Sequence, residues 1–98
     1  MQFLILGYDG KDEEALNRRM AVREAHIALA HDNQNQGKLL FAVAMLDDDG
    51  KMTGSMLVTD FESREELDEY LEVEPYMTGR VWEKIKVIPC AVGPSFRM

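Results

Sequence analysis

The 98-residue chain has a single cysteine, Cys90, a single tryptophan and no apolar run long enough to span a membrane. One cysteine cannot close a disulfide within the chain, and it cannot build a metal site from thiolates. The first residues, MQFLILGYDG, carry no basic segment before their short apolar run, so neither a signal peptide nor a membrane span is expected. These absences predict a protein of the reducing cytoplasm.

Positive charge is also scarce. The chain has 11 Lys and Arg residues against 18 Asp and Glu residues, for a net charge of -7. Binding to nucleic acid or to an anionic membrane requires clustered basic residues, so both kinds of partner are disfavoured. The chain lacks a glycine-rich phosphate loop and the spacings His-x-x-x-His and Cys-x-x-Cys, and its DDDG segment (47–50) lacks the rest of a calcium loop. We therefore expect no cofactor and no metal ion.

The residues that are present fit one globular domain over residues 1–98, with 46% apolar and 30% charged residues. Their apolar patterns predict strands alternating with helices. The predicted strands are 2–8, 38–46, 52–61 and 81–89, the predicted helices are 12–36 and 63–74, and 90–98 is a tail.

Local signals set the boundaries of these elements. Gly37 ends the first helix in the left-handed conformation that glycine adopts readily. Ser63 and Glu66 have the spacing of a capping box at the start of the second helix. Asp49-Gly50 predicts a type I′ turn, so the second and third strands form an antiparallel hairpin.

The order strand, helix, strand, strand, helix, strand predicts an α+β fold. Its compact form is ferredoxin-like, βαββαβ, with a four-stranded antiparallel sheet and both helices on one face. Apolar residues of the middle strands indicate more apolar surface than two helices can cover: Met45, Met56, Leu57 and Val58. A homodimer joined sheet to sheet is therefore expected.

The first helix carries polar residues on its inward face. Arg19, Arg23 and His26 are spaced i, i+4, i+7 between two apolar flanks. Either the arginines extend their charged ends to solvent and His26 makes a structural hydrogen bond, or the three side chains line a wet cavity. Imidazole exchanges protons near neutral pH, so His26 is the catalytic candidate, whereas His31 projects from the polar side and is expected to be solvated.

The second helix ends on an unexpected acid. Its inward stripe at i, i+3, i+4, i+7 is Leu67, Tyr70, Leu71 and Glu74. Glu74 directly precedes Pro75, so either the helix unwinds there and the carboxylate points to water, or the carboxylate meets a partner between the helices. The partners available on the first helix are His26 and the two arginines. A carboxylate beside an imidazole fixes its tautomer and raises its basicity.

The whole chain then resembles the YCII-related family. The resemblance rests on RRMAVREAHIALA, GKLLFAVAM, TGSMLVTDFESREEL and EPYMTGRVWEKIKVIP, which occur in the family's order and cover nearly all of the sequence. It implies a ferredoxin-like dimeric α+β barrel with a His–Asp dyad, and some relatives are dehydrochlorinases of chlorinated aromatic intermediates.

Under this resemblance the family histidine corresponds to His26. The aspartate of the Asp-Pro-Tyr motif corresponds to Glu74, and Pro75 and Tyr76 match as they stand. The glutamate is one methylene longer than the family's aspartate.

Two hypotheses of function follow. The first is a small enzyme without cofactor, a lyase or isomerase that transfers a proton on a small molecule, aromatic or chlorinated if the resemblance extends to the substrate. His26 is its acid or base, Glu74 orients His26, and Arg19, Arg23 and Tyr76 bind substrate. The second hypothesis is a non-catalytic dimeric module that binds a small ligand or another protein.

Overall fold

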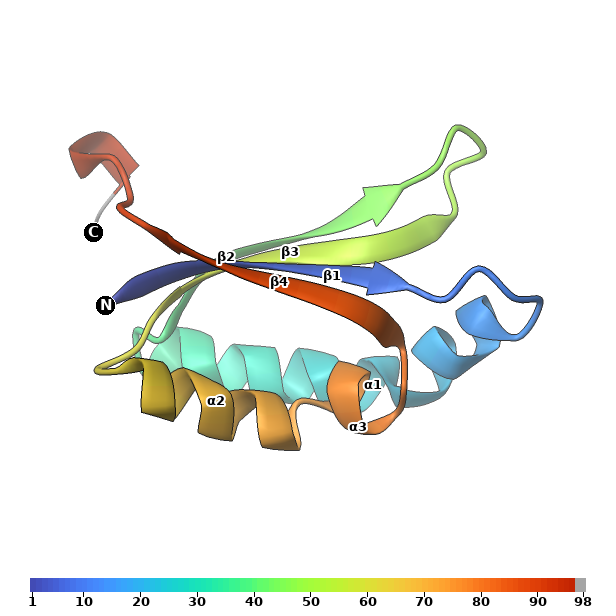
Figure 1. Cartoon of the computed structure of the whole chain (residues 1–98), viewed down its shortest axis with the longest axis horizontal. Helices are drawn as coiled ribbons and strands as arrows, with labels where there is room; N and C mark the ends of the chain where they lie inside the picture. The colour runs from blue at the N-terminus through green and yellow to red at the C-terminus, as the bar shows by residue number, and fades with distance from the viewer. Residues whose placement is uncertain (97–98) are drawn as a thin grey trace.

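The computed structural model describes residues 1–96 and forms one layer of sheet against one layer of helices (Figure 1). Its elements, in chain order, are β1 (Gln2–Asp9), α1 (Ala15–Asn35), β2 (Leu39–Leu46), β3 (Met52–Asp60), α2 (Arg64–Val73), α3 (Pro75–Thr78), β4 (Trp82–Cys90) and a 3-10 turn (Pro94–Phe96). The last two residues of the predicted tail lie outside the described residues.

The sheet has the order β2-β3-β1-β4, and every neighbouring pair is antiparallel. Both long helices and α3 lie on the same face of this sheet (Figure 1). The ferredoxin-like α+β prediction is therefore confirmed. No helix within residues 1–96 has the length and apolar character needed to cross a membrane.

Alternation along β1 decides which side chains face the helices. Phe3 and Ile5 are buried in the core, while Leu4 and Leu6 point to the opposite face. Asp9 continues the inward series and is also buried. An acidic side chain at the inward end of a central strand requires a partner inside the protein.

The predicted helix boundaries agree with the structure to within one residue, except that α1 begins at Ala15 instead of residue 12. Gly37 has φ of 75° and follows α1, and the Lys38 N–H closes the helix end by donating to the Asn33 carbonyl at 2.8 Å. Ser63 accepts a hydrogen bond from the Glu66 N–H at 3.1 Å and caps α2. The end of α1 and the start of α2 therefore fall on residues whose chemistry is visible in the sequence, whereas α1 begins without a side-chain cap.

The prediction of a type I′ turn at Asp49-Gly50 was wrong. Gly50 has φ of 80°, but Asp49 does not have positive φ, because Arg80 is the only non-glycine residue with positive φ in the described part of the chain. The Asp47 carboxylate accepts from the N–H groups of Asp49 and Lys51 at 2.9 and 3.0 Å. This side-chain bonding supports a longer loop in which only Gly50 is left-handed.

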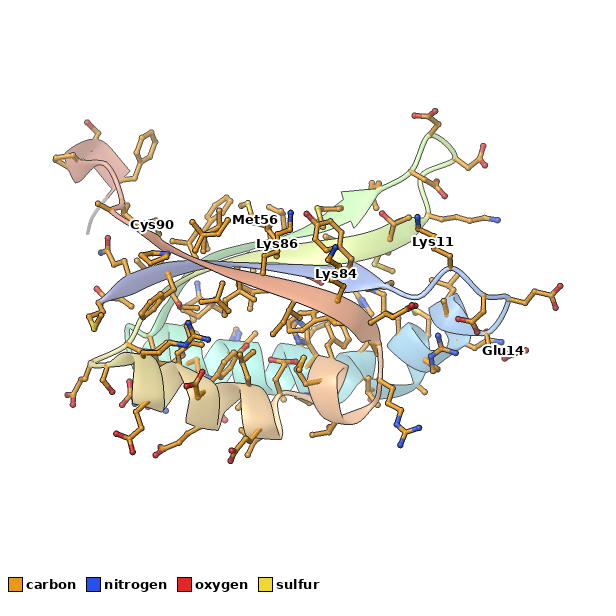
Figure 2. All side chains as sticks on the ribbon, viewed as in Figure 1. Lys11, Glu14, Met56, Lys84, Lys86 and Cys90 are labelled. Carbon is orange, nitrogen blue, oxygen red and sulfur yellow. The ribbon has the colours of Figure 1, made fainter. Side chains whose placement is uncertain are left out.

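The sheet face opposite the helices is uncovered in the monomer. Met56 lies on this face, as Figure 2 shows, and it pairs in register with Val43. Val58 pairs with Phe41, which is 62% exposed. Leu57 was wrongly assigned to this surface, because it is 1% exposed and belongs to the core beneath the helices.

Candidate active site

Glu74 lies between α2 and α3 and points into the protein. Its ψ of 121° ends α2 before Pro75, as expected, yet its side chain is 0% exposed. One carboxylate oxygen, Oε1, accepts from the N–H of Tyr76 at 3.1 Å and so caps α3. The other, Oε2, accepts from the Tyr70 hydroxyl at 2.5 Å. The short turn after Pro75 is what directs this carboxylate inward.

His26 meets the same carboxylate. Its Nδ1 lies 2.5 Å from Glu74 Oε1, and its side chain is 12% exposed. The imidazole stacks on the Tyr76 ring with centroids 3.8 Å apart and an interplanar angle of 8°. These contacts hold both the plane and the rotation of the ring. In a neutral imidazole, a proton held on Nδ1 by the carboxylate leaves Nε2 as the basic nitrogen.

The extra methylene of Glu74 therefore does not separate the two groups. The carboxylate reaches the histidine while it also receives the backbone N–H of Tyr76.

Arg19 is buried and forms an ion pair with an acidic residue that the sequence did not indicate as its partner. It is 3% exposed, and its Nη1 donates to both carboxylate oxygens of Asp9 at 3.0 Å. Its Nη2 donates to Ser55 Oγ at 2.9 Å, and its Cζ lies 4.6 Å from the centroid of the Tyr76 ring. Both ends of the guanidinium are thus engaged by protein groups. The sequence feature that indicates a buried Asp9 is the alternation of β1, which places Asp9 on the same side of the strand as Phe3 and Ile5.

Burial changes the pKa values of the ionisable groups around His26 and Arg19. Burial, together with the adjacent Glu74 carboxylate, raises the pKa of the Tyr70 hydroxyl far above its ordinary value, so Tyr70 remains a donor. Burial also raises the pKa of Tyr76, although Arg19 and Arg23 oppose that rise. The pKa of the Asp9 carboxyl is raised by burial and lowered by Arg19, with burial the larger effect.

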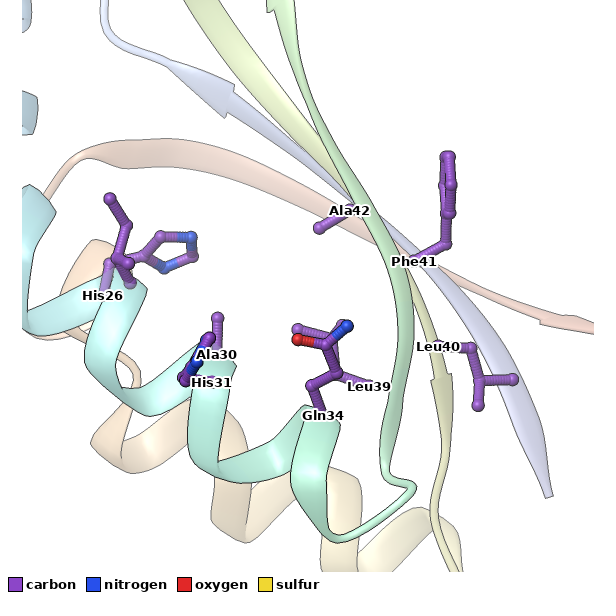
Figure 3. Close-up of a pocket in the computed structure, with 9 residues that line it drawn as sticks. His26, Ala30, His31, Gln34, Leu39, Leu40, Phe41 and Ala42 are labelled. Carbon is purple, nitrogen blue, oxygen red and sulfur yellow. The ribbon is translucent and has the colours of Figure 1, made fainter. Parts of the chain in front are cut away.

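A groove between α1 and β2 reaches this site in two parts. The smaller part, about 150 Å³, is lined by Arg19, Arg23, His26, Ile27, Ala42, Val43, Ala44, Met52, Ser55, Leu57 and Tyr76. The larger part, about 410 Å³, is lined by His26, Ile27, Ala30, His31, Gln34, Leu39, Leu40, Phe41 and Ala42. Figure 3 shows His26 and Ala42 pointing toward each other across the larger part. His26 therefore borders both parts.

The remaining candidate residues differ in their surroundings. Arg23 is exposed, lines the smaller part and forms no ion pair within residues 1–96. His31 is exposed, as expected, and also lies at the edge of the larger part. No group of three or more His, Cys, Asp and Glu side chains in the described residues has the arrangement of a metal site.

Comparisons with known proteins match this chain over most of its length. The model of the YCII-related domain matches residues 1–91. Protein YciI of Escherichia coli O6:H1 is 33% identical over 95 residues, which cover 91% of this chain and 95% of that protein. Protein YciI of Shigella flexneri matches to the same extent.

Two solved structures share the fold. The 5-chloro-2-hydroxyhydroquinone dehydrochlorinase TftG of Burkholderia phenoliruptrix AC1100, in complex with 2,5-dihydroxybenzoquinone, has a TM-score of 0.81 and 26% identity. That match covers 97% of this chain and 98% of TftG. A NIPSNAP domain protein of Burkholderia xenovorans, at 12% identity and a TM-score of 0.50, covers 96% of this chain and 99% of its own and shares the fold alone. With the domain model matching nearly its full length, the chain belongs to the YCII-related family.

Proposed function

We propose that this protein is a lyase without cofactor that removes a proton and a leaving group such as chloride from a small hydroxylated ring. The observation that carries the proposal is the contact between His26 Nδ1 and the fully buried Glu74 carboxylate, beside a groove that His26 borders. The similarity to TftG, a dehydrochlorinase by name, supports the choice of reaction and of substrate class.

The chemistry follows from the orientation of His26. A keto–enol shift of one ring hydroxyl first moves its proton to the carbon that carries chlorine. Nε2 then accepts the proton of the hydroxyl para to the new ketone, and the electron pair of that O–H bond passes through the ring and expels chloride, which leaves with the electron pair of the C–Cl bond. The imidazolium that forms is stabilised by the Glu74 carboxylate at Nδ1. Dehydrochlorination of this kind releases one proton and one chloride ion, and no electron donor or acceptor is needed.

The arginines divide their roles in this proposal. Arg19 is held by Asp9 and Ser55, so it supports the Tyr76 ring on which His26 stacks. Arg23 has no such partner and remains available to bind a substrate oxygen.

The direct test is release of chloride from 5-chloro-2-hydroxyhydroquinone, measured without oxygen and compared with buffer alone. We expect the purified chain to accelerate chloride release. If the compound binds but chloride release is no faster than in buffer, the proposal of a lyase is wrong. The hypothesis of a non-catalytic module that binds a small ligand is then favoured.

We also infer that two copies associate through the uncovered sheet face. The exposed Phe41 and Val43, with Met56 beside them, form an apolar surface of the kind that a second subunit covers. Light scattering after size-exclusion chromatography is expected to report twice the mass of the 11.2 kDa chain. A charge introduced by Val43→Glu is expected to yield the monomer, and a wild-type monomer would refute this assembly.

A further inference from the structure

The two parts of the groove differ in chemistry. The lining of the larger part is apolar over most of its extent, with Ala30, Leu39 and Ala42 among its residues. Its volume of about 410 Å³ lies in the range of small-molecule sites, roughly 300–1,000 Å³. The smaller part, at about 150 Å³, is below that range and has room for a substituent rather than for a whole ligand.

The smaller part contains hydrogen-bond donors that no protein group uses. The Nε of Arg19 is buried without a hydrogen-bond partner among the described residues. The Tyr76 hydroxyl makes no side-chain hydrogen bond within residues 1–96, and this oxygen stays accessible although Tyr76 as a whole is 1% exposed. Arg23 adds a cation without an ion pair in the same part of the chain.

The nearby carboxylates do not neutralise this cation. Asp9 is paired with Arg19, and Glu74 is fully buried with its oxygens bonded to His26, Tyr70 and the Tyr76 N–H. One positive charge is therefore left over at the groove. The net charge of -7 acts over a longer range, and salt screens it beyond about 8 Å at physiological ionic strength.

We propose that the groove selects a ligand with an ionised oxygen on an apolar ring, with the oxygen bound by Arg23 and the Tyr76 hydroxyl in the smaller part and the ring seated in the larger part. This inference rests on the proposed function and narrows its substrate to an acidic phenol or an aromatic carboxylate. His26, which borders both parts, then faces the ring next to the carbon that carries the oxygen.

The test uses two unreactive probes of nearly equal shape, 4-fluorobenzoate and the neutral 4-fluorobenzamide, titrated into the wild-type chain and followed by fluorine NMR. Because Arg23 is exposed and solvent weakens its charge, the hydrogen bond predicts about three- to fivefold tighter binding of the benzoate. Arg23→Gln is expected to remove this preference, and Arg64→Gln, the same loss of charge on α2 outside the groove, is expected to preserve it. Ala30→Leu, which fills the larger part, is expected to weaken both probes.

Several results would overturn the inference. They are equal binding of the two probes to the wild-type chain, no binding of either at millimolar concentration, a preference that survives Arg23→Gln, and unchanged binding after Ala30→Leu. Because the probes cannot react, the result of the binding experiment does not depend on whether the chain releases chloride. Selective binding without chloride release refutes the lyase alone, and chloride release without selectivity refutes the anion site alone.

Discussion

Replacement of His26 by glutamine is expected to lower the kcat of the proposed chloride release by about 10²- to 10⁴-fold, the range that general acid–base catalysis supplies. Glutamine is polar and similar in reach, so it can still donate to the Glu74 carboxylate, but it cannot accept a proton from substrate. Affinity for 4-fluorobenzoate is expected to stay within a few-fold of the wild type. A loss in kcat without a loss in binding separates a chemical role from a structural one.

His31→Gln is the matched control for this variant. It removes the other histidine of the chain, which lies on the same helix and at the same groove but has no carboxylate partner among the described residues. We expect kcat to stay within a few-fold of the wild type, with any effect of the variant falling on KM, because His31 borders the part of the groove proposed to hold the ring. Equal losses in the two variants, or a His26→Gln chain with wild-type kcat, would remove His26 from the mechanism.

Asp9→Asn is expected to lower the free energy of unfolding by about 3–5 kcal/mol, because it leaves the buried guanidinium of Arg19 without its counter-charge. A domain of this size is stable by only about 5–15 kcal/mol, so the variant should unfold at much lower urea concentration. The loss should also disturb the packing of Arg19 on the Tyr76 ring. Urea unfolding, monitored through the fluorescence of Trp82, measures this loss in the free energy of unfolding.

Asp12→Asn is the control for Asp9→Asn. Asp12 also binds an arginine through two hydrogen bonds, at 2.6 and 2.8 Å to Arg18, but that pair is exposed. Solvent screens exposed pairs, so little change is expected there. The double variant Asp9→Asn with Arg19→Met should recover part of the stability, since it removes the unpaired charge. Similar effects of Asp9→Asn and Asp12→Asn would contradict this account.

The fold could be predicted because its signals are local. The apolar run of β1, the capping residue Ser63 and the stop at Gly37 each act through neighbours in the chain. The assignment of Leu57 failed because β3 has apolar residues on both faces, so alternation does not show which face is inward.

The site could be predicted in part. Helical spacing placed His26 and Glu74 on inward faces, and the structure brings them into contact. Spacing could not distinguish Arg19 from Arg23, which lie one turn apart on α1. The surroundings of the two arginines differ because Asp9, at the end of β1, pairs with Arg19 alone. In the sequence, Asp9 has the composition of a polar turn around it and was not predicted to lie in the strand. The alternation of β1 is enough to place Asp9 inward, but its contact with Arg19 depends on tertiary packing, which no short pattern encodes.

The arrangement of α1 has a consequence for how this site can be altered. Asp9, Arg19 and Glu74 are fixed by buried pairs, whereas Arg23 and Ala30 border the groove without taking part in those pairs. In the proposed site, ligand preference is therefore set at residues that lie outside the buried pairs. Related chains that differ in these groove residues are then expected to differ in the ligand they prefer while they keep the contact between His26 and Glu74.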